Sequence, residues 1–196
     1  MSIRLQLFTG FFVLFLIFFI NYFVNQRLSN QVLINTTYIS NSEAVIRNSN
    51  ILHKEIIEMQ SGFRGFLLTG QEVFLEPYYE GTRSVPPLIK EELSLLTSPN
   101  QKEKLDSIYS LHKEWLNYAD ALIATRLDTL PEASKKYREL FDTKLRMEVG
   151  KKLNDKIHTL FYSFDNYEYK IRLERRERLQ DSLSYTKNIT LGLALV

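Results

Sequence analysis

Cysteine is absent from this sequence of 196 residues, and glycine and proline are scarce, with seven and five copies. The lack of cysteine excludes disulfide bonds, zinc ribbons, iron–sulfur clusters and attached c-type haem. Few glycines and prolines, together with 44% hydrophobic residues, argue against disorder and against a turn-rich β protein. A formal net charge of +2 gives no reason to expect nucleic acid as a partner. The composition therefore predicts a mostly helical chain.

A long run without any charged residue lies near the N-terminus, at residues 5–24. About 20 apolar residues in a helix cover the hydrocarbon layer of a bilayer. A cleaved signal peptide is the alternative, but a cleavage site needs small residues and the first alanine is Ala44. Arg4 and Arg27, on the two sides of the run, weakly favour a cytoplasmic N-terminus. We therefore expect a cytoplasmic segment at 1–4, followed by a transmembrane helix.

A second apolar run, from Ile189 to Val196, ends the sequence. Its eight residues are too few to cross a bilayer, which needs about 20 in a helix. We expect residues 188–196 to be the start of a truncated second transmembrane helix. Residues 25–187 would then form an extracytoplasmic domain between the two spans. The alternative is an apolar tail that packs into a core.

All five prolines lie between residues 77 and 131. Because proline breaks helix interiors, the arms on either side can form very long helices. The pattern predicts an all-α fold, a membrane-anchored antiparallel four-helix bundle with two long and two shorter helices. The four stretches are 28–70, 72–97, 100–128 and 131–187.

Apolar residues recur at alternating three- and four-residue spacing in three of these stretches. This spacing is typical of helices that pack nearly parallel to one another. Two polar residues, Asn35 and Ser42, fall at seam positions farther upstream, where we expect looser packing. The apolar seam positions are Leu52, Ile56, Met59, Phe63 and Phe66; Leu105, Ile108, His112, Trp115, Ala119 and Leu122; and Leu153, Ile157, Leu160, Phe164, Tyr167 and Ile171.

Motifs for catalysis or metal binding are missing from the sequence. Helix bundles with di-iron sites carry two Glu-x-x-His pairs, and here only Asp155-x-x-His158 comes near, with no second copy. Metalloprotease, phosphate-loop and serine-hydrolase motifs are also missing. The adjacent carboxylates Glu91 and Glu92 are interpreted as part of a solvated helix face. We predict no catalytic residue, no metal site and no cofactor, and the sequence names no ligand-binding residue.

One run of unusual composition extends from residue 58 to residue 78. It predicts a helix with Arg64 on its buried face, a close helix approach at Gly65 and a C-terminal cap at Gly70. This run resembles the signature of the third CHASE-type domain, and the resemblance continues in order and spacing over about residues 25–187. The matching positions are Glu58, Arg64, Gly65, Phe66, Leu67, Leu68, Thr69, Gly70, Phe74, Leu75, Pro77 and Tyr78.

The resemblance implies an extracytoplasmic sensory input module of a transmembrane receptor, most directly a bacterial sensor histidine kinase in the inner (cytoplasmic) membrane. Such a module would have no enzymatic activity of its own, would form a homodimer, and would respond to an unknown small-molecule or protein stimulus. A shift of the last helix by about 1–2 Å would carry the signal. The alternatives are a chemotaxis-type or cyclase receptor, or a membrane scaffold without signalling. The candidate signalling seam is Asn35, Ser42, Phe164, Tyr167 and Ile171.

Overall fold

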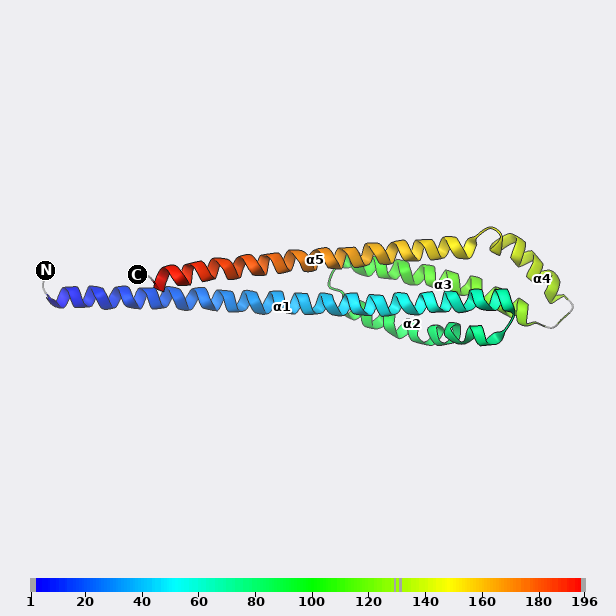
Figure 1. The fold of residues 1–196 in the computed structure, drawn as a ribbon, viewed down its shortest axis with the longest axis horizontal. Helices are drawn as coiled ribbons and strands as arrows, with labels where there is room; N and C mark the ends of the chain where they lie inside the picture. Colours follow the sequence, from blue (N-terminus) through cyan, green and yellow to red (C-terminus); the bar gives the residue numbers. More distant parts are fainter. Residues whose placement is uncertain (1–2, 129, 131, 195–196) are drawn as a thin grey trace. The chain divides into compact units, whose positions relative to one another are not determined.

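A computed structural model describes residues 3–128, 130 and 132–194, and every regular element within these residues is helical (Figure 1). The all-α prediction is therefore confirmed. The elements in chain order are α1 (Ile3–Thr69), the 3-10 helix η1 (Glu72–Leu75), α2 (Glu76–Leu95), α3 (Pro99–Leu127), α4 (Ala133–Leu140), the π-helical turn η2 (Phe141–Leu145) and α5 (Val149–Ala194).

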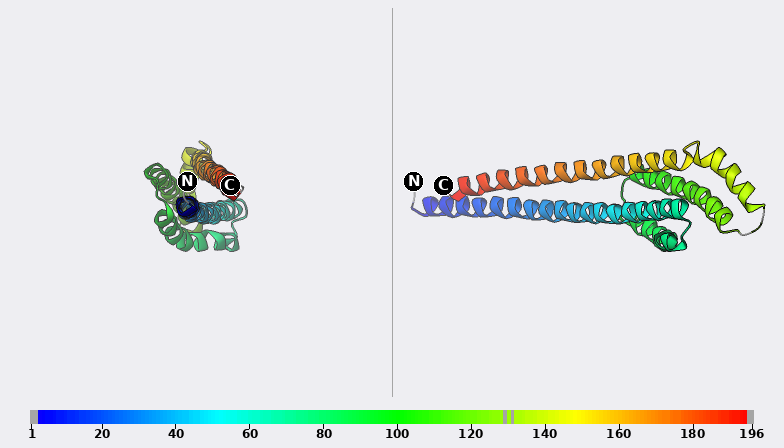
Figure 2. Two further views of the ribbon diagram at one scale, coloured as in Figure 1. Left: turned by 90° about the vertical axis from the view of Figure 1, so that its left-hand side faces the viewer. Right: turned by 45° about the vertical axis from the view of Figure 1, so that its right-hand side comes forward.

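The chain divides into two units, and α1 and α5 each contribute to both. One unit comprises Glu43–Tyr169; we call it the four-helix unit after α1, α2, α3 and α5, and it also contains the short α4. The other, the two-helix unit, comprises Met1–Ser42 together with Lys170–Val196. In the four-helix unit, short connections after α1 and α2 reverse the chain, so that α2 and α3 lie alongside the C-terminal part of α1 (Figure 2). This arrangement agrees with the predicted antiparallel bundle.

The core of the four-helix unit is built from the seam residues that the sequence indicated. All the predicted seam positions of α1 and α3 are buried, and in α5 the deepest side chains are Leu153, Ile157, Phe161 and Phe164. Leu160 packs against this core and is only partly buried. The three-and-four spacing thus placed one continuous stripe of each helix in the interior, as expected for nearly parallel packing.

The end of α1 follows from two glycines. Gly70 has a φ of +72°, and its backbone N–H donates to the carbonyl of Phe66 at 2.8 Å, which is the predicted C-terminal cap. At Gly65, a Cβ atom would lie 2.6 Å from a ring carbon of Phe74. The predicted close approach is therefore present, and its neighbour is the η1 segment that follows the turn.

The prediction of a single helix over 131–187 is wrong. Within the described residues, α4 and η2 precede a turn, and α5 begins only at Val149. Glu148 in this turn has a φ of +57°, which a helix cannot accommodate. The apolar spacing that predicted this helix begins only at Leu153, and upstream of it η2 buries no residue fully, although Leu145 packs against the core.

The two-helix unit contains the N-terminal part of α1 and the C-terminal part of α5. Among the described residues, α1 is the one helix long and apolar enough to cross a membrane, judged by length and composition. Asn35 and Ser42 are buried, although polar, and Ile171 is half-buried. The boundaries proposed for the membrane segments stay predictions, and Pro131, which the sequence placed at the start of the last helix, lies outside the described residues.

Candidate functional site

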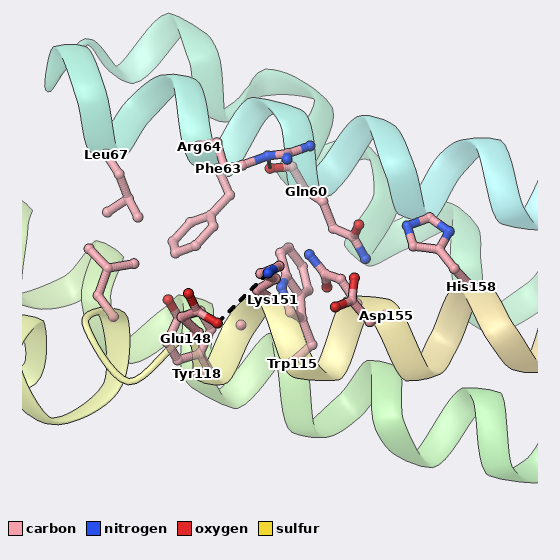
Figure 3. A pocket seen from close by; sticks show the side chains of 13 residues that line it. Gln60, Phe63, Arg64, Leu67, Trp115, Tyr118, Glu148, Lys151, Asp155 and His158 are labelled. Atoms are coloured by element: carbon pink, nitrogen blue, oxygen red, sulfur yellow. Dashed lines mark hydrogen bonds and ion pairs between the residues drawn. The ribbon is translucent and has the colours of Figure 1, made fainter.

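A pocket of about 430 Å³ lies between α1, α3 and the start of α5 in the four-helix unit (Figure 3). Pockets for small molecules have volumes of about 300–1,000 Å³, so this one has room for a small ligand. Phe63 of α1 and Trp115 of α3 come from the apolar seams, whereas α5 contributes residues beside its seam, such as Asn154 and His158. The sequence analysis named no ligand-binding residue, because a pocket depends on which faces of different helices meet.

The apolar wall of the pocket is a cluster of three aromatic rings. Phe63 from α1 meets Trp115 edge to face, with ring centroids 5.7 Å apart at 84°. It meets Tyr118 in the same way, at 5.8 Å and 73°. Edge-to-face contacts of this kind are favourable, and all three residues are buried, so the wall is a packed and pre-formed surface.

A further part of the lining comes from the junction between η2 and α5. Leu145 ends η2, and Glu148 follows with its left-handed backbone conformation. A Cβ atom at Gly150 would lie 2.6 Å from the Tyr118 ring, so α5 begins in very close contact with α3. A non-glycine residue with positive φ and a π-helical turn are both uncommon, and both are found frequently at functional sites.

Two polar groups at the pocket are buried without a partner. The Gln60 side chain comes from a residue only 2% exposed, and its Nε2 donor has no hydrogen bond within the described part of the chain. The Oδ1 acceptor of Asn154 is also a buried atom without a hydrogen-bond partner among the described residues. A buried polar group without a partner costs about 1–3 kcal/mol, so both atoms have a strong preference for a group that would occupy the pocket.

Four charged side chains surround these groups, two of each sign. Lys151 Nζ lies 3.8 Å from Glu148 Oε2, and both side chains are largely exposed. Arg64 donates from Nε to the carbonyl of Gln60 at 3.3 Å. In Figure 3, the Gln60 amide extends from α1 toward α5, in the direction of Asp155. The pocket therefore offers donors, acceptors and both signs of charge beside an aromatic wall.

A histidine pair lies at the end of the pocket. His53 Nε2 and His158 Nδ1 are 2.7 Å apart, and the His53 ring stacks on Phe161 with centroids 4.3 Å apart. Burial, and then the charge on His158, lower the pKa of His53 to about 4. At neutral pH His53 is uncharged, so the two rings share a single hydrogen bond whose direction depends on their tautomers.

The family-signature residues form mainly the joint between α1, η1 and α2. Phe66, Leu75 and Tyr78 are buried there, and Tyr78 Oη donates to Asp120 Oδ1 at 2.7 Å. Burial, and then this hydrogen bond to a carboxylate, raise the pKa of Tyr78. The members that are half-buried or exposed are Glu58, Arg64, Gly65, Leu67, Leu68, Thr69, Gly70, Phe74 and Pro77.

The expectation that Arg64 lies on a buried face is wrong, because its side chain is exposed at the rim of the pocket. Its long stem lets the guanidinium leave the helix interface, as is usual for arginine. Leu67 also lines the pocket. Glu58 lies on the outer surface of α1 and pairs with Lys54 at 3.4 Å.

The interpretation of Glu92 as part of a solvated face is also wrong. Glu92 is 0% exposed, and neither carboxylate oxygen has a hydrogen-bond partner among the described residues. Burial, and then the charges of Glu168, Asp165 and Glu91, raise the pKa of Glu92 to about 8. The sequence held a signal for this, because Val85, Ile89, Glu92 and Leu96 follow one another at 4-3-4 spacing, with Glu92 on the apolar stripe.

Glu92 belongs to a layer of polar side chains within the four-helix unit, most of which are buried. Asn48 Nδ2 donates to Glu91 Oε1 at 3.0 Å, and Ser49 Oγ donates to Asp165 Oδ1 at 2.7 Å. Burial raises the pKa of Asp165, while the hydrogen bond from Ser49 opposes the shift. The layer is completed by Gln101, whose Nε2 donates to Glu168 Oε1 at 3.0 Å. We call these seven residues the acidic layer: Asn48, Ser49, Glu91, Glu92, Gln101, Asp165 and Glu168.

The candidate signalling-seam residues are divided between the two units. Phe164 is buried and Tyr167 half-buried in the four-helix unit, where the Tyr167 hydroxyl lies 3.4 Å from Ser98 Oγ. In the two-helix unit, Asn35 lines a groove of about 470 Å³ together with Arg175, among others. Phe164 and Tyr167 therefore belong to one unit, and Asn35, Ser42 and Ile171 belong to the other.

Metal binding finds no support in the described part of the chain, where no group of three or more histidine, aspartate or glutamate side chains is arranged to hold an ion. The Asp155-x-x-His158 pair noted in the sequence lies at the pocket instead, with His158 bound to His53.

Comparison with known families agrees with the sequence signature. The family model of the CHASE3 domain matches residues 35–178, which is well over half of the chain. No curated protein and no solved structure matches the sequence significantly. The matched range includes the whole four-helix unit and the pocket within it. The chain therefore belongs to the CHASE3 domain family, the extracytoplasmic sensory domains of signalling receptors.

Proposed function

We propose that this chain is the sensory input module of a membrane-anchored sensor histidine kinase, and that α5 relays the stimulus toward the membrane. The observation that carries the proposal is the CHASE3 match over residues 35–178, preceded in the same chain by an apolar segment long enough to span a bilayer. We place residues 5–24 in the bacterial inner membrane and residues 25–187 outside it, in a homodimer.

The relay requires a helix that connects the stimulus site with the membrane end of the module. α5 begins beside the pocket, at the turn formed by Glu148, and continues without a break to Ala194. A stimulus that binds one arrangement of the start of α5 better than another shifts the population toward that arrangement. Displacements of about 1–2 Å at helix interfaces are sufficient in known switches.

The polar seam positions Asn35 and Ser42 supply the second part of the mechanism. Both are buried in the two-helix unit, where a fully apolar seam would pack more tightly. Buried polar groups at seam positions lower the stability of the packed seam, which brings a second packing closer to the first in free energy. We propose that these two packings are the two signalling states.

The topology is tested with reporter fusions after Gly70 and after Asn100, in the intact chain. Alkaline phosphatase, which is active only outside the cytoplasm, should be active at both positions, and a cytoplasm-dependent fluorescent protein should be dark at both. Reporters with the opposite pattern would refute an extracytoplasmic sensor.

The relay is tested in the full-length receptor in membranes with the double substitution Asn35→Leu and Ser42→Leu. We expect the receptor to become locked in one state, so that kinase autophosphorylation no longer responds to a stimulus. The matched control is Asn30→Leu with Ser40→Leu, because both residues are exposed in the same helix. Normal regulation in the seam variant would refute the relay, and a chemotaxis or cyclase output would refute the kinase assignment.

A further inference from the structure

We propose that the pocket between α1, α3 and α5 binds a small zwitterion with an apolar or aromatic side chain, in chemical terms a free apolar α-amino acid such as phenylalanine or leucine. This inference rests on the sensory function proposed above, for which it names the chemical class of the stimulus. It is argued from the apolar wall, from the two unpartnered polar atoms and from the balance of charge.

The aromatic wall selects an apolar side chain. Phe63, Trp115 and Tyr118 form a packed surface, and Leu67 and Leu145 add aliphatic groups to the lining of the pocket. An apolar group placed here would be removed from water, and aromatic rings would gain edge-to-face or stacked contacts in addition. A ligand that is polar throughout would leave this surface poorly matched.

The two unpartnered atoms demand one acceptor and one donor from the ligand. Gln60 Nε2 is a buried donor without an acceptor, and Asn154 Oδ1 is a buried acceptor without a donor, within the residues that the structure describes. They come from different helices, α1 and α5. A carboxylate can accept from the first and an ammonium group can donate to the second, so that one zwitterion satisfies both.

The charges at the pocket favour a ligand that carries both signs. Arg64 and Lys151 are positive, Glu148 and Asp155 are negative, and these four are the Lys, Arg, Asp and Glu side chains among its described lining residues. A simple anion would be attracted by the two positive side chains and repelled by the two negative ones. A simple cation would be attracted by the negative pair and repelled by the positive pair. A zwitterion carries both signs of charge, so its carboxylate is attracted by Arg64 and Lys151 and its ammonium group by Glu148 and Asp155.

The position of the pocket explains how such a ligand would act on the receptor. One wall is the junction of η2 and α5, with Leu145 and the left-handed Glu148. A ligand held between Gln60 on α1 and Asn154 on α5 joins the two long helices at the start of α5. Occupancy therefore stabilises one position of α5 relative to α1 within the four-helix unit.

The binding test uses the full chain in detergent micelles and its single tryptophan as the probe. Trp115 is 1% exposed and lines the pocket, so its emission reports both folding and occupancy. The titrants are L-phenylalanine, 3-phenylpropionate, which lacks the ammonium group, and 2-phenylethylamine, which lacks the carboxylate. We expect saturable binding of phenylalanine and at least about tenfold weaker binding of both analogues, because each leaves a buried polar group unpaired.

Two results of this titration would overturn the inference. The first is equal or tighter binding of either analogue, which would mean that only one charged group is recognised. The second is the absence of a response to phenylalanine and leucine while Trp115 emission and far-ultraviolet circular dichroism report a folded helical protein.

Substitutions at the pocket test the roles of individual side chains. Gln60→Leu should weaken phenylalanine binding by at least about tenfold, through loss of the buried donor. Gln180→Leu makes the same chemical change on an exposed face of α5 and should leave binding unchanged. If Gln60→Leu binds phenylalanine as tightly as the original chain, the assignment of the carboxylate to Gln60 is refuted.

Two exposed residues provide a selectivity readout that does not depend on core packing. Arg64→Gln removes a positive charge and should shift selectivity from 3-phenylpropionate toward 2-phenylethylamine, whereas Asp155→Asn should shift it in the opposite direction. Unchanged relative affinities in both variants would refute the charge argument. The binding assay involves no signalling output, so reporters that refute the extracytoplasmic topology leave its result intact, and a failure to bind leaves the topology intact.

Discussion

Glu92 should make the stability of this protein depend on pH in the direction opposite to ordinary acid denaturation. The carboxyl group is fully buried in the acidic layer, and its pKa is raised to about 8 from the usual 4.5. The folded state therefore keeps the proton up to about pH 8, whereas the unfolded chain releases it near pH 4.5. The contribution of Glu92 to the free energy of unfolding should fall as the pH rises through this interval, by at most about 1.4 kcal/mol per pH unit.

The perturbation is Glu92→Gln, which keeps the size of the side chain and remains neutral at every pH. As the pH rises from the lower to the higher of the two pKa values, the protein with Glu92 should lose roughly 3 to 5 kcal/mol of stability. The Glu92→Gln variant should not show this loss. At pH 5 the two proteins should be of similar stability. At pH 8 and above, Glu92→Gln should be the more stable by roughly that amount.

The assay is denaturant unfolding of the full chain in detergent micelles, followed by Trp115 emission from pH 5 to pH 9 at constant ionic strength. The relevant quantity is the difference in unfolding free energy between the two proteins at each pH. Other groups in the layer, such as Asp165, titrate in both proteins and largely cancel in this difference. Glu103→Gln, the same change at an exposed position of α3, is the matched control.

The reasoning would be refuted if the difference in unfolding free energy between Glu92→Gln and the original chain did not change with pH. Such a result would mean that Glu92 is ionised in the folded state at neutral pH and is stabilised there by water or by a cation. The reasoning would also be refuted if Glu103→Gln changed the pH dependence of the unfolding free energy as much as Glu92→Gln did.

Three further predictions concern the four-helix unit. Burial lowers the pKa of His112 to about 4, so the contribution of this group to stability should be lost as the pH falls from about 6.5 to 4. His112→Gln should remove this loss, a difference of up to about 3 kcal/mol from the original chain in acid denaturation curves. Gly62→Ala should cost about 1–3 kcal/mol in chemical unfolding, since its Cβ would lie 2.5 Å from a backbone oxygen, whereas Gly192→Ala, with open space around it, should cost nothing. Tyr78→Phe should cost about 1 kcal/mol through loss of the hydrogen bond to Asp120, and a double-mutant cycle with Asp120→Asn checks that the two residues are coupled.

The sequence by itself determined the features that depend on local interactions and on periodicity. The scarcity of glycine and proline indicated helices, and the three-and-four spacing identified the buried stripes of α1 and α3 correctly. Gly70 indicated the end of α1, because a residue with positive φ is a local requirement of a helix cap. The signature around Arg64 indicated the family, which the match over residues 35–178 confirmed.

The tertiary structure alone decided where polar side chains lie and where a pocket forms. Arg64 is exposed and Glu92 buried, the reverse of the expectations, because exposure depends on the neighbouring helix and on the length of the side chain. The break at Glu148 was equally hidden, since the positive φ there falls on a residue that is not glycine. Periodicity gives one face of one helix at a time, whereas the pocket exists only where faces of α1, α3 and α5 meet, and that meeting is a long-range property of the folded chain.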